Sequence, residues 1–301
     1  MLPFLQSLYH AIRSTLEQPF PIEYTPCHHE IETLEYFNQS DKVLFRDLSI
    51  KINTQKQVIL CFTNRCGSNW LAELLYATEL MGLADEFFNT ERIQADCVEC
   101  GLNSLDDFVR HLPGNHSTLN KIFATKLSWD QLYFLSRTKV IPWIIPNPQF
   151  IYIVRDDVAA QALSFLVAQQ TGQWKSNWNS GLNGKIELAD ISNEQIITAI
   201  SEILFAQSKF ELYFEMLKLN PCRIHYEDLL AKPEFIIARI LQYLKIPAPK
   251  KMEINSAKLQ LEKQRDEQSE KRLERFHRET EDRYNFLRMG SIAGSVHESV
   301  R

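Results

Sequence analysis

The segment 63–69, TNRCGSN, carries the residue types that hold an anion. It follows an apolar run at 58–62 that predicts a buried strand, and it precedes a helical pattern of leucines. Backbone N–H groups and the positive end of the dipole at a helix start favour negative charge. Glycine permits close approach, while arginine and hydroxyl groups add hydrogen bonds. We therefore expect an anion to be bound by Arg65, Cys66, Gly67, Ser68 and Asn69.

This loop differs from the phosphate loops of kinases and NTPases. It lacks the G-x-x-x-x-G-K-[ST] pattern, and therefore the lysine and the magnesium-binding hydroxyl of those enzymes. A metal-dependent nucleoside triphosphatase is accordingly disfavoured. A purely structural alternative remains open, in which the segment is a tight turn from strand to helix with Ser68 as the N-cap.

A second cationic position follows another predicted strand. Arg155 comes directly after the apolar run 150–154, and Ser164 lies in the helical pattern that follows. Ligands of open parallel sheets gather at the carboxyl ends of the strands, so both arginines are expected on one rim, a ribose apart. Two anion sites suit a nucleotide with phosphates at both ends of its ribose. The alternative is that Arg155 pairs with Asp156 or Asp157 in a helix cap.

The elements that must position these residues alternate along the chain. Short apolar runs predict strands at 57–62, 121–127, 150–154 and 223–226. Helical patterns or helix-favouring sequence follow them, notably at 68–82, 158–171 and 193–219. This order predicts an α/β fold, a three-layer domain with a mainly parallel central sheet and helices on both faces. Residues 258–282 alternate in charge and predict a solvated helix.

Composition limits the partners. The 301 residues carry 33 Lys and Arg against 38 Asp and Glu, a net charge of −5, so we expect no nucleic-acid partner and no anionic lipid surface. No apolar stretch approaches the roughly 20 residues of a membrane span. Residues 1–20 lack the pattern of a secretory signal, and six cysteines spread over the chain suit a reducing compartment, so the expected location is cytoplasmic.

The domain boundaries follow the same composition. We expect an N-terminal extension at 1–56, a main domain at 57–282 and a C-terminal tail at 283–301. The extension could cover the acceptor site or build a homodimer contact. The segments CHH at 27–29 and CVEC at 97–100 have no second ligand pair at a compatible spacing, so no metal is expected.

Five segments in order resemble the Stf0-type sulfotransferases, a group that includes trehalose 2-sulfotransferase. They are CFTNRCGSNW at 61–70, DEFF at 85–88, KLSWDQ at 126–131, VRDDVAAQALSF at 154–165 with QTGQW at 170–174, and EKQRDEQS at 262–269. The resemblance covers about 57–280. It implies a P-loop-like fold, 3′-phosphoadenosine-5′-phosphosulfate (PAPS) as co-substrate, and transfer of its sulfuryl group to a carbohydrate hydroxyl, on a sugar or a glycolipid.

The resemblance also assigns roles. The loop 65–69 would hold the 5′-phosphosulfate, and Arg155 and Ser164 the 3′-phosphate, with Lys263 and Gln264 closing over the nucleotide. Glu86 would be the general base. Sulfuryl transfer needs an in-line hydroxyl and charge stabilisation on the leaving phosphate, which Arg65 and Lys126 could supply. The residues expected to contact the acceptor are Asp85, Phe88, Trp129, Gln170 and Trp174.

Some residues depart from the family pattern. Thr63 and Cys66 replace serines, Asn69 replaces a threonine, and Arg272 stands where a tryptophan is usual. Two alternatives to a carbohydrate sulfotransferase therefore stay open: a non-catalytic nucleotide- or sugar-binding relative of the same fold, and an atypical P-loop kinase. Trp129 could equally belong to the core, and Glu86 could be an ordinary surface acid.

Overall fold

The structure is a computed structural model that describes residues 28–37, 56–118, 120–138, 140–143, 145, 147–174, 188–247 and 267–295. Contacts divide the chain into two compact units. Unit 1 comprises Met1–Asp156 and Phe205–Gln260, and unit 2 comprises Asp157–Leu204 and Leu261–Arg301. Each unit is described by itself.

Unit 1 is built on a parallel sheet of four strands in the order β2-β1-β3-β4. The strands are β1 (Lys56–Cys61), β2 (Ile122–Leu127), β3 (Gln149–Val154) and β4 (Cys222–His225), each within one residue of its predicted bounds. The register pairs Cys61 with Leu127 and Tyr152, and Val154 with His225. All four strands therefore end at the same edge of the sheet, where the sequence places the candidate site.

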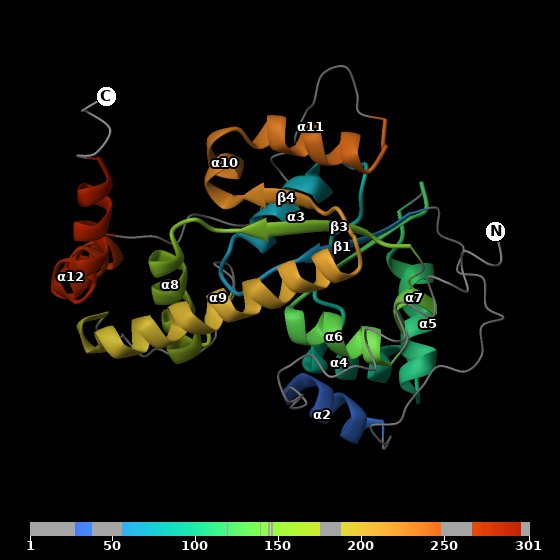
Figure 1. The fold of residues 1–301 in the computed structure, drawn as a ribbon. Coiled ribbons are helices and arrows are strands. Elements are labelled where there is room, and N and C mark those ends of the chain that lie inside the picture. Colours follow the sequence, from blue (N-terminus) through green and yellow to red (C-terminus); the bar gives the residue numbers. More distant parts are fainter. Residues whose placement is uncertain are drawn as a thin grey trace. The chain divides into compact units, whose positions relative to one another are not determined.

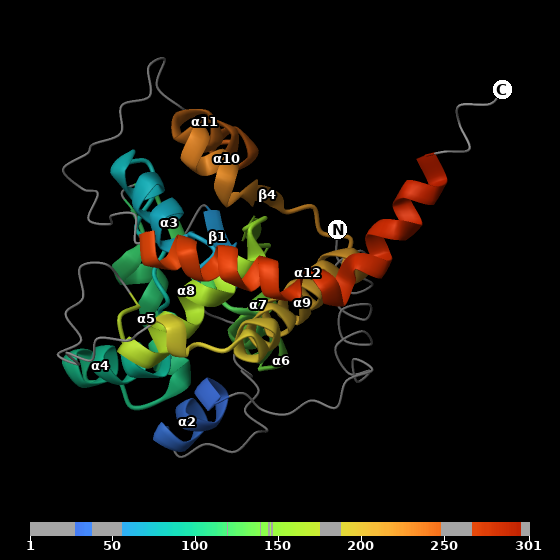
Figure 2. The same cartoon turned by 90° about the vertical axis from the view of Figure 1, so that its left-hand side faces the viewer.

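Both faces of this sheet are covered, as the predicted α/β fold requires. Alternate residues of each strand enter different cores, Ile59 on one face and Leu60 on the other. One face packs against α3 (Ser68–Ala77), α10 (Tyr226–Ala231) and α11 (Pro233–Tyr243). The other packs against α2 (His28–Tyr36), α4 (Thr90–Cys100), α5 (Leu105–His116), α6 (Trp129–Arg137) and α7 (Val140–Trp143). The two groups lie on opposite sides of the sheet in both views (Figures 1 and 2).

Long helix α9 (Asn193–Met216) contributes to both units, and its end lies within three residues of the prediction. Its last turns bring Phe210, Tyr213 and Phe214 to the unit 1 core, where they meet rings of β3. Aromatic pairs of this kind add to the stabilisation that burial itself provides.

Unit 2 contains α8 (Val158–Thr171), the short helix η1 (Leu188–Asp190), the first part of α9 and α12 (Glu267–Ser295), which packs on α8 (Figure 2). The predicted charged helix near 258–282 is present from Glu267, and most of its described side chains are exposed, but one stripe of it is buried. Leu273 and Phe276 enter a core, and the buried guanidinium of Arg272 donates to the carbonyl of Ile191 at 2.6 Å and to Oδ1 of Asn193 at 2.8 Å. A charge-rich sequence can still bury one stripe of a helix.

The strand order fixes where a ligand can enter. The chain leaves β1 toward β2 on one side, and it leaves β3 toward β4 on the other side. β1 and β3 are neighbours, so their connections diverge, and in such sheets ligands bind at the carboxyl ends of these two strands. Arg65 follows β1 and Arg155 follows β3, which places both at this edge.

Candidate active site

The loop between β1 and α3 is held by its backbone. The N–H of Cys66 donates to the carbonyl of Thr63 at 3.3 Å, and the N–H of Leu71 donates to the carbonyl of Gly67 at 3.1 Å. Arg65 and Gly67 have φ angles of 64° and 92°, in the left-handed region. Gly67, rather than Ser68, is the N-cap of α3, so the structural alternative with Ser68 as the N-cap does not hold. Ser68 instead hydrogen-bonds to the thiol of Cys66.

Two arginines meet at this loop. Nη1 of Arg155 donates to the carbonyl of Arg65 at 3.5 Å. Burial and, next in size, the charge of Arg155 lower the pKa of Arg65 from its ordinary value, as expected for two cations side by side. Both arginines therefore lie at the same edge of the sheet, where they form one cationic patch. Two separate anion sites a ribose apart stay a prediction.

The neighbouring acids have other partners. Oδ1 of Asp156 lies 2.7 Å from Nδ1 of His225, and Oδ1 of Asp157 accepts the N–H of Ala160 at 2.9 Å to cap α8. Among the described residues, the buried Nε of Arg155 has no hydrogen-bond partner. A buried donor without a partner is costly, and an anion at this edge would remove the cost for a guanidinium.

A lysine joins the loop to the predicted base. Lys126 of β2 is 1 % exposed, and its Nζ donates to Oδ1 of Asn69 and to Oε1 of Glu86, the latter at 3.1 Å. Nζ also lies 5.5 Å from the ring centroid of Phe62. The ammonium is thus held at the sheet edge by a residue of the anion loop and by the candidate base, which the sequence had placed in separate segments.

Backbone hydrogen bonds to β2 hold the segment that carries Glu86. The carbonyl of Asp85 accepts the N–H of Lys126 at 2.9 Å and the hydroxyl of Thr125 at 3.1 Å, and Asp85 pairs with Thr125 as a parallel bridge. Oδ1 of Asp85 accepts the N–H of Glu86 at 2.9 Å. Asp85 therefore orients the acid beside it.

Two predicted acceptor contacts are core residues. Phe88 is 3 % exposed and meets the ring of Phe108 edge-on at 6.1 Å. Trp129 is 7 % exposed and meets Phe210 edge-on at 5.6 Å. Neither ring offers a face on which a sugar could lie, so the expectation that they bind the acceptor is wrong. Apolar type alone does not distinguish a pocket wall from a core.

The remaining predicted residues belong to unit 2 or lie outside the described residues. Ser164 and Gln170 lie in α8, and the ring of Trp174, just beyond it, lies 6.1 Å from that of Phe165. Lys263 and Gln264 lie outside the described residues. The grouping of Ser164 with Arg155 stays a prediction.

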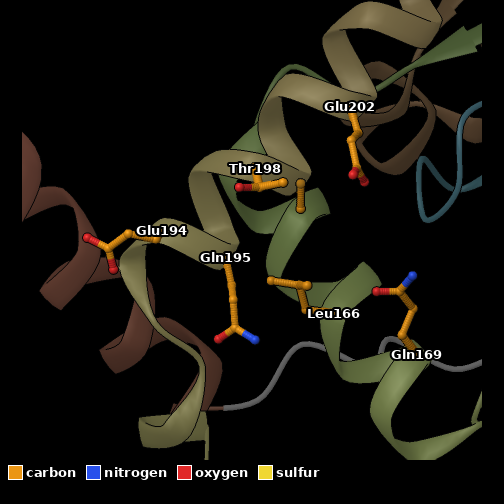
Figure 3. Close-up of a pocket in the computed structure, with 7 residues that line it drawn as sticks. Leu166, Gln169, Glu194, Gln195, Thr198 and Glu202 are labelled. Atoms are coloured by element: carbon orange, nitrogen blue, oxygen red, sulfur yellow. The ribbon is translucent and has the colours of Figure 1, made fainter.

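A shallow hollow of about 300 Å³ in unit 2 is lined by side chains of α8 and α9 (Figure 3). Its lining residues are Leu166, Gln169, Glu194, Gln195, Thr198, Ala199 and Glu202. None of the predicted site residues lines it, and its two carboxylates are unsuited to an anionic nucleotide.

The sequence did not single out Tyr226 and His225. They stand at the carboxyl end of β4, and the ring of Tyr226 contacts the patch, with its centroid 5.0 Å from the guanidinium carbon of Arg155. Their position at the end of the fourth predicted strand, 223–226, was the available signal. Ligand-side residues are expected at every carboxyl end of such a sheet.

A family model described as Stf0 sulphotransferase matches residues 57–279. The chain belongs to the Stf0 sulfotransferase family. Among solved structures, the sulfotransferase domain from the Curacin biosynthetic pathway is similar, with 13 % identity, 74 % of this chain and 98 % of that chain covered, and a TM-score of 0.39. A comparison with curated proteins gives no match.

As an Stf0 sulfotransferase, the chain transfers a sulfuryl group to an acceptor. Within the described ranges no three metal-binding side chains come together, and Cys97 is buried whereas Cys100 is exposed. None of the helices that the structure describes combines the length and apolar composition of a membrane span.

Proposed function

We propose that this sulfotransferase moves the sulfuryl group of PAPS to a carbohydrate hydroxyl by in-line displacement. The observation that carries the proposal is the patch of Arg65 and Arg155 at the carboxyl ends of β1 and β3, beside the cluster of Lys126, Glu86 and Asn69. A strongly anionic sulfuryl donor requires cationic hydrogen-bond donors, and a hydroxyl acceptor requires a carboxylate that can take its proton. Both kinds of group lie at this one edge of the sheet.

The hydrogen-bond donors at this edge suit a nucleotide that carries phosphates on both sides of its ribose. The guanidinium of Arg65 and the backbone N–H groups of 65–69, apart from that of Cys66, which donates to the carbonyl of Thr63, would hold the 5′-phosphosulfate at the start of α3. Arg155, whose buried Nε lacks a partner among the described residues, would hold the 3′-phosphate. Ser164, Lys263 and Gln264 stay predicted contacts of the nucleotide.

The chemistry follows from the cluster. The acceptor oxygen forms a bond to sulfur while the bond from sulfur to the 5′-phosphate oxygen breaks, and the hydroxyl proton passes to Glu86. Adenosine 3′,5′-bisphosphate leaves with the electron pair. Lys126 and Arg65 stabilise the charge that develops on it. The ammonium also fixes the direction of the Glu86 carboxylate through the 3.1 Å contact.

A covalent sulfuryl-cysteine route is disfavoured by the state of the loop thiol. Burial raises the pKa of Cys66 to about 11, so the thiol stays protonated at neutral pH and is a poor nucleophile. The backbone N–H of Cys66 donates to the carbonyl of Thr63 and so holds the shape of the loop. The replacement of the family serine therefore removes one hydroxyl contact and leaves direct transfer as the route.

The carbohydrate acceptor is the finer part of the proposal. Support comes from α8, where Gln170 is exposed and Trp174 presents a partly exposed ring, the combination that sugar-binding surfaces use. Asp85 could bind an acceptor hydroxyl with the edge of its carboxylate, which is 25 % exposed.

The test is incubation with sulfur-35 PAPS and a panel of disaccharides and glycolipids, beside phosphorus-33 ATP. We expect labelled sulfate on a carbohydrate and no labelled phosphate. Glu86→Ala should keep affinity for adenosine 3′,5′-bisphosphate and lose turnover, whereas Arg155→Ala should lose affinity. Glu99→Ala, an exposed acid of α4, is the control. Tight nucleotide binding with no turnover on any acceptor would favour the non-catalytic alternative, and phosphate transfer would favour a kinase.

A further inference from the structure

Three consecutive residues, the last of β4 and the first two of α10, hold the segment that follows β3. Nδ1 of His225 lies 2.7 Å from Oδ1 of Asp156, and Oε2 of Glu227 accepts the N–H of Asp156 at 3.1 Å. Between them, the ring of Tyr226 lies under the guanidinium of Arg155, with 5.0 Å between centroid and Cζ. Each of the three residues therefore contacts the pair Arg155–Asp156.

The same ring also touches the anion loop. A Cβ atom built on Gly67 would overlap Cδ2 of Tyr226 and lie 2.7 Å from its Cε2. Gly67 therefore has two reasons to be glycine, its φ of 92° and the ring against its Cα. One half-buried side chain thus contacts both the loop after β1 and the arginine after β3.

We propose that Tyr226 is a positioning residue that holds Arg155 and the loop at Gly67 in the arrangement that binds the two ends of the nucleotide. This inference rests on the proposed use of PAPS. It extends that proposal to a side chain that makes none of the proposed phosphate contacts and acts through the two groups that do.

The need for such a residue follows from charge and freedom. Arg65 and Arg155 repel one another, since the charge of Arg155 lowers the pKa of Arg65. A long arginine side chain also has many rotamers, and binding one phosphate selects only a few of them. The face of an aromatic ring attracts a guanidinium and limits these rotamers. Unlike a carboxylate, the ring does not neutralise the charge of the guanidinium.

The ring face carries this role, and the hydroxyl does not. The test therefore compares Tyr226→Leu with Tyr226→Phe, and uses Tyr243→Leu as the matched control. Tyr243 lies in α11, packs against the same core, and donates its hydroxyl to the carbonyl of Asn220 at 3.0 Å, away from the patch. Affinity for adenosine 3′,5′-bisphosphate, KM for PAPS, kcat and Tm are measured for each full-length variant.

Tyr226→Leu should weaken binding of the bisphosphate and raise KM for PAPS, each about tenfold. This is the effect expected when one cation–π contact and the preorganisation of Arg155 are lost together. The value of kcat should change less than threefold. Tyr226→Phe should match the wild type. Tyr243→Leu should lower Tm without weakening binding. Wild-type affinity in Tyr226→Leu, or an equal loss in Tyr243→Leu, would overturn the inference.

Two further outcomes are also decisive. If Tyr226→Leu does not fold, Tyr226→Met supplies the same comparison. If neither variant folds, Tyr226 is needed for the fold itself, and the inference is overturned. Absence of bisphosphate binding by the wild type would instead refute the proposed function. A loss in Arg155→Ala with none in Tyr226→Leu would leave the proposed function standing and reject the positioning role.

Discussion

Replacing Arg155 by methionine should have little effect on the fold and a large effect on nucleotide binding. The guanidinium stacks on Tyr226, and its charge opposes that of Arg65. Losing the cation–π contact costs about 0.5–1 kcal/mol, and relief of the repulsion offsets part of that cost. The free energy of unfolding without ligand should therefore change by less than about 1 kcal/mol.

The effect on binding is larger because a phosphate loses charged donors. Two charge-assisted hydrogen bonds at about 1.5 kcal/mol each amount to about 3 kcal/mol, or about a 100-fold loss of affinity for adenosine 3′,5′-bisphosphate. At a concentration of 1,000 times the wild-type Kd, the bisphosphate adds about 4.1 kcal/mol to wild-type stability. The same concentration is about 10 times the Kd of the variant and adds about 1.4 kcal/mol.

The assay is chemical denaturation of wild type and variant, each with and without the bisphosphate, supported by calorimetric titration. Arg223→Met is the control, because Arg223 is an exposed cation of β4 paired with Glu211 and its loss changes the net charge equally. Equal stabilisation of wild type and Arg155→Met by the bisphosphate would refute the reasoning, and so would a loss of more than about 2 kcal/mol without ligand.

Three other predictions follow from buried groups. Lys126→Met should lower kcat/KM for sulfuryl transfer about 100- to 1,000-fold, because one hydrogen-bond donor to the charge that develops on the leaving phosphate is lost. Steady-state assays with saturating acceptor would measure this loss. The thiol of Cys66, with its pKa raised to about 11, should resist iodoacetamide at pH 8 in the folded protein while exposed Cys100 is alkylated; mass mapping that finds Cys66 labelled first would contradict this. Burial lowers the pKa of His116 below its ordinary 6.5, so the unfolded state binds the proton first and stability falls as pH drops below about 6.5. Urea unfolding at pH 7.5 and 5.5 should show a smaller loss in His116→Phe, and an unchanged loss would contradict the assignment.

Local patterns predicted the strands and the anion loop well. An apolar run such as 58–62 is a strand whichever sheet it joins, and TNRCGSN after it sets a strand–loop–helix unit. The placement of Arg65 and Arg155 on one rim followed from the rule for parallel sheets. The N-cap of α3 is Gly67, one residue before the Ser68 of the structural alternative, and its φ of 92° is a conformation that glycine permits but does not require.

Contacts between distant segments could not be predicted. Phe88 and Trp129 have the residue types of a sugar platform, and only their packing against Phe108 and Phe210 shows that they are core. The contact of Tyr226 with Gly67 joins residues that lie far apart in sequence. Such contacts depend on the order of the strands in the sheet, and neither composition nor periodicity determines that order.

The backbone bridge between Asp85 and Thr125 has a consequence for redesign of the enzyme. Since the proposed proton acceptor next to this bridge is tethered to the sheet by main-chain bonds, libraries that diversify side chains elsewhere would leave the backbone that carries it in place. A change of product in such libraries would then reflect how the acceptor is presented, with turnover preserved.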